Sequence, residues 1–213
     1  MSASAEQSLR DAYIDLVKRT ITNYAYLGGE TPFDQFRCVT HYQVGQGEWK
    51  IDPLARPATL LSKAQLDLIE QSVIAVEKRG VPGDFIEAGI WRGGAIAFMR
   101  AMIKAYDIPD RRIFASDSFA GIPKNRRAVG DPVDAWRDRW IAGLEEVRGN
   151  IERFGFLDDR IRFVPGFFAD SLPALANEQF ALMRLDSDSY DSVEESLVYL
   201  YPLLSSGGVI IID

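Results

Sequence analysis

The sequence is poor in side chains that hold disulfides or bind metal ions through sulfur or imidazole. Among its 213 residues it has one cysteine, Cys38, and one histidine, His41. A single cysteine excludes an internal disulfide and a cysteine-based zinc cluster, so we expect Cys38 to be an inert core residue. We expect His41 to be structural, because it falls in a stretch without periodic apolar residues.

Long apolar runs and an excess of positive charge are also missing. No stretch approaches the roughly 20 apolar residues of a membrane span, and the first residues lack the basic and then apolar pattern of a signal peptide. The 24 Lys and Arg residues are outnumbered by 31 Asp and Glu residues, which gives a net charge of −7. We therefore predict a cytoplasmic protein that binds neither membranes nor nucleic acid, in which the basic run at 124–127 is a solvated loop tip.

The beginning of the chain predicts an amphipathic helix over residues 6–25. Apolar side chains recur there at helical spacing, at Leu9, Tyr13, Leu16 and Val17. Residues 28–58 then break into Gly, Pro and polar residues, which indicates an irregular connector or a lid.

A second helix is predicted from Ser62 to Arg79, with Ser62 as its N-cap and Gly80 at its end. We interpret residues 1–80 as an N-terminal helical extension and lid. Residues 81–213 form the second unit, a Rossmann-like domain.

Strands and helices alternate in this second unit. The predicted strands are "DFIEAG", "RIFASDS", "IRFVPG", "FALMRLDSDS" and "GGVIIID", and the predicted helices are 93–106, 137–154 and 193–203. Such alternation with nearly continuous apolar strands predicts an α/β fold, a doubly wound and mostly parallel sheet covered on both faces. The sequence stops at Asp213, at the end of the fifth strand. Doubly wound sheets usually continue further, so we expect C-terminal strands to be missing from it.

Acidic residues stand at or near the ends of four predicted strands, at Glu87, Asp117, Asp186 and Asp213. Ligands of open α/β sheets bind beyond the carboxyl ends of the strands. One acidic residue there can simply cap the following helix, but four together indicate a binding site.

The first of these strands runs into a glycine-rich turn, "EAGIWRGG". Its glycines are not spaced as in the dinucleotide fingerprint G-x-G-x-x-G, and Glu87 would repel a pyrophosphate. This disfavours a nicotinamide dehydrogenase. Glu87 suits a cationic ligand such as S-adenosylmethionine, and Asp117, at the end of the second strand, is placed to bind both hydroxyls of a ribose.

Five segments together resemble the macrocin-type O-methyltransferases. They are "VPGDFIEAGIWRGGA", "FASDSFAGIP", "IRFVPGFFADSLP", "LMRLDSDSY" and "YPLLSSGGVIIID". Members of this family are S-adenosylmethionine-dependent and metal-dependent enzymes that methylate sugar hydroxyls of macrolides and related secondary metabolites. The resemblance implies a class I methyltransferase fold, and it runs from about Tyr13 to the last residue.

The resemblance also implies roles for individual residues. Those matching cofactor-binding positions are Thr59, Leu60, Glu87, Ala88, Gly89, Ile90, Trp91, Asp117, Ser118, Phe119, Gly121, Gly166 and Phe167. Residues 87–91 would surround the methionine part of the cofactor, Asp117 would hold the ribose, and residues 166–167 would border the adenine. Thr59 and Leu60 match a segment that closes over the cofactor.

A magnesium site and a catalytic base follow from the same resemblance. Asp186 matches the first metal-binding aspartate, and Asp213 matches the first of an adjacent pair that completes the Mg²⁺ site. The acceptor is then a small molecule with a sugar or polyol hydroxyl, and Asp186, or failing it Asp188, would take its proton. Family members commonly carry a histidine after the "GIP" motif, and this sequence has none there.

Two alternative functions stay open at this stage, and a nicotinamide dehydrogenase is the third and weakest. The acceptor could be a catechol-like diol, since that chemistry also uses a metal held by strand-end aspartates. The chain could instead be an inactive remnant that binds a cofactor or a partner. Trp136 and Trp140 could line an acceptor pocket or a subunit contact, and the sequence is compatible with a homo-oligomer without determining one.

Overall fold

The structure is a computed structural model that describes residues 2–36, 56–127, 130–135 and 140–213. Its helices are α1 (Ala3–Ile21), α2 (Tyr24–Leu27), α3 (Lys63–Lys78), α4 (Gly94–Ala105), α5 (Leu144–Arg153), α6 (Phe168–Ser171) and α7 (Tyr190–Leu200). Its strands are β1 (Asp84–Ala88), β2 (Ile113–Asp117), β3 (Ile161–Pro165), β4 (Phe180–Leu185) and β5 (Leu204–Ile212), and short 3₁₀ turns cover Pro132–Ala135, Leu172–Leu175 and Tyr201–Leu203. Cys38, His41, Trp136 and most of the predicted connector lie outside the described residues.

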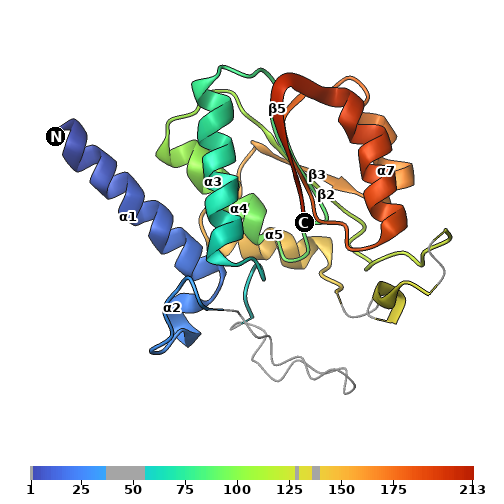
Figure 1. Cartoon of the computed structure of the whole chain (residues 1–213), viewed down its shortest axis with the longest axis horizontal. Coiled ribbons are helices and arrows are strands. Elements are labelled where there is room, and N and C mark those ends of the chain that lie inside the picture. Colours follow the sequence, from blue (N-terminus) through green and yellow to red (C-terminus); the bar gives the residue numbers. More distant parts are fainter. Residues whose placement is uncertain (1, 37–55, 128–129, 136–139) are drawn as a thin grey trace.

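The five strands form one sheet in the order β3-β2-β1-β4-β5, and every neighbouring pair is parallel. Strands β2 and β3 are added on one side of β1, and β4 and β5 on the other. Ligands of doubly wound folds bind where the strand order switches in this way, here between β1 and β4. Helices α1, α3, α4 and α5 share one hydrophobic core on one face, and α6 and α7 cover the other face (Figure 1). The predicted parallel sheet with helices on both faces is confirmed.

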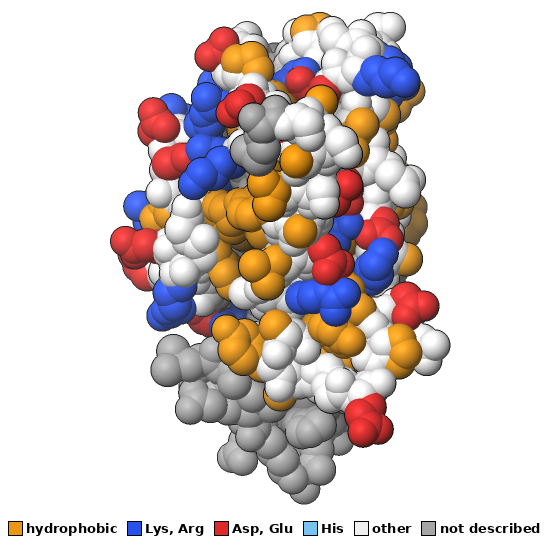
Figure 2. Space-filling view, turned by 90° about the vertical axis from the view of Figure 1, so that its left-hand side faces the viewer, with side chains coloured by type: hydrophobic (Ala, Val, Ile, Leu, Met, Phe, Trp, Pro, Cys, Tyr) orange, Lys and Arg blue, Asp and Glu red, His pale blue; other side chains and the backbone are white. Residues whose placement is uncertain are grey.

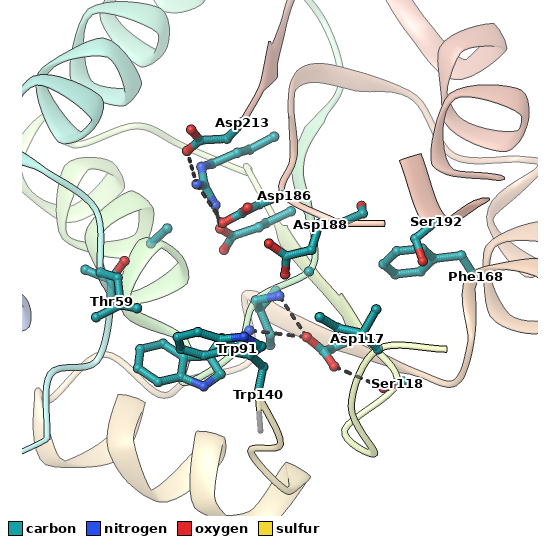
Figure 3. Close-up of a pocket in the computed structure, with 18 of the residues that line it drawn as sticks. Thr59, Trp91, Asp117, Ser118, Trp140, Phe168, Asp186, Asp188, Ser192 and Asp213 are labelled. Carbon is teal, nitrogen blue, oxygen red and sulfur yellow. Dashed lines mark hydrogen bonds and ion pairs between the residues drawn. The ribbon is translucent and has the colours of Figure 1, made fainter. Parts of the chain in front are cut away.

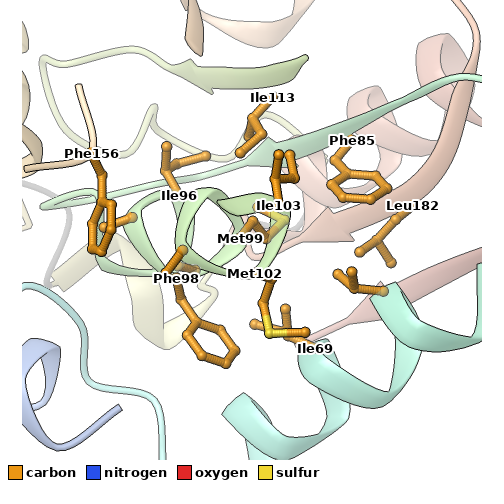
Figure 4. Close-up of a cluster of buried hydrophobic side chains, with 14 of the residues drawn as sticks. Ile69, Phe85, Ile96, Phe98, Met99, Met102, Ile103, Ile113, Phe156 and Leu182 are labelled. Atoms are coloured by element: carbon orange, nitrogen blue, oxygen red, sulfur yellow. The ribbon is translucent and has the colours of Figure 1, made fainter. Parts of the chain in front are cut away.

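Crossover helix α4 supplies much of the larger core. Phe98, Met99, Met102 and Ile103 are essentially inaccessible to solvent (Figure 4). Phe98 lies on the side of α4 away from the strands, where the ammonium of Lys18 in α1 lies over its ring. Burying side chains of this size contributes roughly 1.5–3 kcal/mol each. This helix therefore fixes the turn that precedes it against the sheet.

The predicted helix at residues 6–25 is present as α1, which begins earlier, at Ala3. Of its predicted apolar positions Val17 is buried and Tyr13 packs against the core, whereas Leu9 and Leu16 were placed wrongly. Helix α1 ends at Ile21, and Asn23 adopts a left-handed conformation with φ 60° before the short α2. Leu9 and Leu16 are each 59% exposed. Besides Val17, the buried positions are Ile14, Lys18 and Ile21, and Lys18 is accommodated because its ammonium pairs with Asp67 and Glu70 of α3.

Helix α1 lies along α4, and its N-terminal end projects away from the sheet (Figure 1). Acidic and basic side chains are interspersed on this side of the molecule around an apolar area (Figure 2). Among the described residues in that view no basic stripe runs across the face. No helix of the described chain is both long and apolar enough to cross a membrane.

Helix boundaries follow capping chemistry more closely than apolar spacing. Helix α3 has the predicted start, where Ser62 and Gln65 form a reciprocal capping box. Helix α5 begins only at Leu144, after Gly143. Residues 140–143 were predicted to be helical and are not, while residues 137–139 of the predicted helix lie outside the described residues. Helix α7 begins before the predicted Val193, because the Ser189 hydroxyl accepts a hydrogen bond from the Ser192 N–H.

Candidate active site

One pocket of about 390 Å³ lies at the carboxyl edge of the sheet, at the crossing between β1 and β4 (Figure 3). Most of the residues predicted for the site line it: Thr59, Leu60, Glu87, Gly89, Ile90, Trp91, Asp117, Ser118, Gly121, Phe167, Asp186 and Asp213. Ala88, Phe119 and Gly166 do not line it. The pocket thus gathers residues from segments up to 154 positions apart in the chain, between Thr59 and Asp213.

Gly89 allows β1 and β4 to approach each other at this edge. Its φ is 88°, and a Cβ at this position would lie 1.8 Å from the carbonyl oxygen of Asp186. No other residue fits so close to a backbone atom. The Asp186 N–H donates to the Ala88 carbonyl oxygen at 2.9 Å, which fixes where the Asp186 side chain leaves β4.

Asp117 organises the turn that follows β1. One of its carboxylate oxygens accepts hydrogen bonds from the N–H groups of Ile90 at 2.9 Å and Trp91 at 3.2 Å. The other accepts from the Phe119 N–H at 2.8 Å. Burial raises the pKa of Asp117, and these three N–H donors offset part of that rise. Phe119 does not line the pocket, but its N–H group helps to orient the carboxylate of Asp117.

Arg184, which sequence reasoning missed, lies among the acidic residues. Its side chain is 3% exposed, and its Nη1 pairs with Oε1 of Glu87. Its Nη2 donates to Oδ2 of Asp186 at 2.9 Å and to Oδ2 of Asp213 at 2.5 Å. Burial alone would lower the pKa of Arg184, but attraction by Glu87, Asp186 and Asp213 holds it above its usual value.

Arg184 provides a hydrogen-bond partner for only one of the two carboxylate oxygens of Glu87. Its other carboxylate oxygen, Oε2, is buried and has no hydrogen-bond partner among the described residues. Burial raises the pKa of Glu87 to about 7, because desolvation outweighs the attraction of Arg184. A buried carboxylate with a spare oxygen at a pocket wall favours a cationic ligand.

Asp188 stands in a strained position on the same edge. Its φ is 57°, a conformation that residues other than glycine rarely adopt. Figure 3 shows its side chain between Asp186 and Asp117. Burial, together with the neighbouring carboxylates of Asp186 and Asp117, raises the pKa of Asp188 to about 6. Such strain and such pKa shifts gather at functional sites.

The charges of the pocket are unbalanced. The charged side chains that line it are the carboxylates of Glu87, Asp117, Asp186, Asp188 and Asp213 and the guanidinium of Arg184. Five carboxyl groups against one guanidinium leave the pocket negative even where Glu87 and Asp188 are partly protonated, and this favours positively charged ligands. The described residues contain no cluster of three or more His, Cys, Asp or Glu side chains placed to hold a metal ion. Asp186 and Asp213 nevertheless direct one oxygen each to the same point, the Nη2 atom of Arg184, so their donor atoms fit a hard cation.

One wall of the pocket is aromatic. Trp91 and Trp140 stack edge to face, with ring centroids 5.7 Å apart and an interplanar angle of 76°. Trp140 lines the pocket, which favours the first of its two predicted roles, while Trp136 lies outside the described residues. Phe168, Ile122 and Pro123 add apolar surface.

The segment before α3 is fastened over the start of α4. The N–H of Gly94 donates to the Ala58 carbonyl at 3.0 Å, and Nε of Arg92 donates to the Pro57 carbonyl at 2.9 Å. The N–H of Ala58 in turn donates to the Ile21 carbonyl at 2.9 Å. These bonds bring Thr59 to the pocket, as the resemblance implies.

The loop after β2 is tied to α7 through its backbone. The carboxylate of Asp191 accepts from the N–H of Arg126 at 2.5 Å and of Arg127 at 3.3 Å, and the Asn125 side chain accepts from the Asp191 N–H at 3.1 Å. The side chains of Arg126 and Arg127 are 76% and 66% exposed, as predicted for a solvated tip. What the sequence did not indicate is that buried Asp191 holds their backbone.

Comparison with known proteins identifies the family. The model of the macrocin O-methyltransferase (TylF) family matches residues 10–213. The chain belongs to this family, and it is an O-methyltransferase. The "8-demethyl-8-(2,3-dimethoxy-alpha-L-rhamnosyl)-tetracenomycin-C 4'-O-methyltransferase" of Streptomyces olivaceus is 39% identical to it over 97% of this chain and 80% of that protein.

Two further comparisons agree with this macrocin-family assignment. The "Mycinamicin III 3''-O-methyltransferase" of Micromonospora griseorubida is 34% identical over 95% of this chain and 82% of that protein. The solved structure of the O-methyltransferase NovP superposes with a TM-score of 0.80 at 32% identity, covering 96% of this chain and 84% of that one. The predicted class I methyltransferase fold is thereby confirmed, whereas the roles of individual site residues stay predictions.

Proposed function

We propose that this macrocin-family enzyme transfers the methyl group of S-adenosylmethionine to a hydroxyl of a sugar or polyol in a secondary metabolite, with Mg²⁺ as cofactor. The observation that carries the proposal is the acidic pocket at the carboxyl edge, with five carboxylates and one guanidinium. Its charge suits a sulfonium and a divalent cation together. The relatives from Streptomyces olivaceus and Micromonospora griseorubida, named for a rhamnosyl tetracenomycin and for mycinamicin III, support an acceptor of this class.

The cofactor would lie along the turn after β1. Residues 87–91 would surround its methionine part, and the negative charge of the pocket would favour its cationic groups. Asp117 would bind the ribose through Oδ1, which accepts from the Phe119 N–H at 2.8 Å and from the Ser118 hydroxyl only at 3.5 Å. Phe167 would border the adenine, and Thr59 and Leu60 would close over it.

The metal ion would be held by Asp186 and Asp213. When bound, it would orient the acceptor and lower the pKa of its hydroxyl, while S-adenosylmethionine would supply the methyl group. The task of the protein is then to place the acceptor oxygen in line with that methyl group and to exclude water. Asp186 would accept the proton of the hydroxyl, with Asp188 as the alternative.

The aromatic wall bears on the choice of acceptor. Trp91 and Trp140 present ring surface that would pack equally against the C–H face of a sugar or against a catechol-like diol. A direct comparison separates the two: a rhamnosylated aglycone and a simple catechol are offered at equal concentration with S-adenosylmethionine and Mg²⁺. We expect methyl transfer to the sugar hydroxyl and little to the catechol.

The proposal is tested first by calorimetry of S-adenosylmethionine binding to the wild type and to Asp186→Asn, with and without Mg²⁺. We expect the cofactor to bind both proteins and Mg²⁺ to register only with the wild type. Cofactor binding without any response to the metal would favour the inactive remnant. If S-adenosylmethionine does not bind at all, the proposed function is wrong, and NADH serves as the comparison for a dehydrogenase.

A further inference from the structure

Arg184 is a charged residue within a buried strand. In the sheet it pairs with Glu87 of β1 and with Ile211 of β5, so its backbone lies between two neighbouring strands. A guanidinium this deeply buried needs partners, because an unpaired buried charge is very costly. The structure supplies three carboxylates, one each from Glu87, Asp186 and Asp213.

The two ends of the guanidinium are used differently. Nη1 pairs with Glu87, whereas Nη2 is shared between Asp186 and Asp213, the two proposed metal ligands. A Mg²⁺ ion bound to the same two oxygens would lie about 2.0–2.1 Å from each. It would therefore take nearly the position that Nη2 has in this structure. The arginine and a metal ion cannot both occupy that position.

An alternative partner for the displaced nitrogen is already present. Oε2 of Glu87 is buried and has no hydrogen-bond partner among the described residues. A guanidinium that keeps its bond to Oε1 of Glu87 can turn a second nitrogen toward Oε2 and form the bidentate pair typical of arginine and carboxylate. Glu87 thus anchors Arg184 in both arrangements.

On the basis of the proposed magnesium-dependent function, we propose that Arg184 is a tethered cation that competes with the metal ion. Without metal it holds Asp186 and Asp213 together. A divalent ion displaces Nη2 from these two carboxylates, and the guanidinium moves onto both oxygens of Glu87. Gln65 donates to Oδ1 of Asp213 at 2.6 Å and keeps this carboxylate oriented during the exchange.

The test is a titration of Mg²⁺ into the wild type and into Arg184→Gln, followed by calorimetry without cofactor or acceptor. We expect Arg184→Gln to bind Mg²⁺ about tenfold tighter, because a competing positive charge next to the metal is removed. The matched control is Arg112→Gln. Arg112 also pairs with two carboxylates, Asp84 and Glu178, but Asp84 begins β1 at the opposite edge of the sheet, so its removal should leave Mg²⁺ affinity unchanged.

A second variant covers the case in which Arg184→Gln does not fold. Arg184→Lys keeps the charge but has no fork that could bridge three carboxylates, so it too should bind Mg²⁺ more tightly than the wild type. Equal or weaker Mg²⁺ binding by the folded variants would overturn the inference and leave the proposed function intact. If no variant binds Mg²⁺, the inference and the metal dependence are both wrong, while binding of S-adenosylmethionine by the same preparations reports separately on the rest of the proposed function.

Discussion

Glu87 and Arg184 occupy paired positions on β1 and β4, and their side chains form an ion pair that is 2% and 3% exposed. The pair lies where the carboxyl edge of the sheet meets the pocket. Because one oxygen of Glu87 has no partner among the described residues, this carboxylate is a costly charge in the folded protein. The stability of the enzyme should therefore depend on pH through Glu87.

We predict that Glu87→Gln changes the pH dependence of unfolding. The pKa of Glu87 is about 7 in the folded protein against an ordinary value of 4.5. The folded state then binds the proton more tightly, so its contribution to stability is complete below pH 4.5 and is lost as the pH rises to about 7. The difference in unfolding free energy between wild type and variant should shift by up to about 3 kcal/mol over this range.

Urea unfolding without cofactor, at several pH values, measures this difference. Glu152→Gln, an exposed carboxylate on α5, is the control and should keep the wild-type pH dependence. A difference between wild type and Glu87→Gln that does not vary with pH would show that Glu87 stays ionised beside Arg184.

Gly94→Ala should weaken cofactor binding by displacing the segment that carries Thr59. A Cβ at Gly94 would lie 2.6 Å from the Cβ of Thr59 and 2.7 Å from the carbonyl group of Ala58. Forcing a methyl group into such contacts typically costs about 1–3 kcal/mol. We expect calorimetry with S-adenosylmethionine to show a loss of affinity of about tenfold or more.

Gly149→Ala provides the matched control for this substitution. Gly149 also lies within a helix, α5, but the nearest atom to its added Cβ is 3.9 Å away, in the side chain of Arg153. It should raise stability by roughly 1 kcal/mol and leave cofactor affinity unchanged. Unaltered cofactor binding by Gly94→Ala would mean that the segment at 57–60 does not contribute to the site.

Asp191→Ala should loosen the loop after β2. The variant loses the acceptor of the Arg126 and Arg127 N–H groups, and hydrogen bonds to a charged group contribute about 1.5–3 kcal/mol. We expect faster amide hydrogen exchange over residues 122–127, with helix α7 otherwise protected. Glu194→Gln removes only the exposed ion pair to Arg127 and should have little effect. Unchanged exchange in Asp191→Ala would contradict the assignment.

The strands and the acidic edge could be predicted because they depend on local patterns. Apolar runs bounded by turn residues define β1 and β2. An acidic residue at the end of a strand lies at the carboxyl edge of a parallel sheet, regardless of the register in which the strands pair. Apolar spacing was less reliable at the surface. Leu9 and Leu16 fit a helical stripe, yet the buried stripe of α1 is set by Ile14 and by the paired Lys18.

Arg184 and Asp191 could not be predicted in this way. Each acts through partners distant in sequence, Glu87 for the first and residues 126–127 for the second, so only the packing of the strands and loops brings them together. The available signal for Arg184 was its place inside the apolar stretch "LMRLD", because an arginine at a buried strand position needs carboxylates as partners.

Asp117→Ala should weaken the binding of S-adenosylmethionine for two reasons. The proposed ribose contact is lost, and the N–H groups of Ile90 and Trp91 lose the acceptor that holds the turn. A hydrogen bond to a charged group contributes about 1.5–3 kcal/mol, so the dissociation constant should rise by roughly 10- to 150-fold. Asp117→Asn keeps one oxygen for these donors, so its affinity for S-adenosylmethionine should lie between those of the wild type and Asp117→Ala. Asp158→Ala, which removes a carboxylate paired with Arg100 away from the pocket, is the control and should bind the cofactor as the wild type does. Wild-type affinity in Asp117→Ala would exclude this carboxylate from the cofactor site.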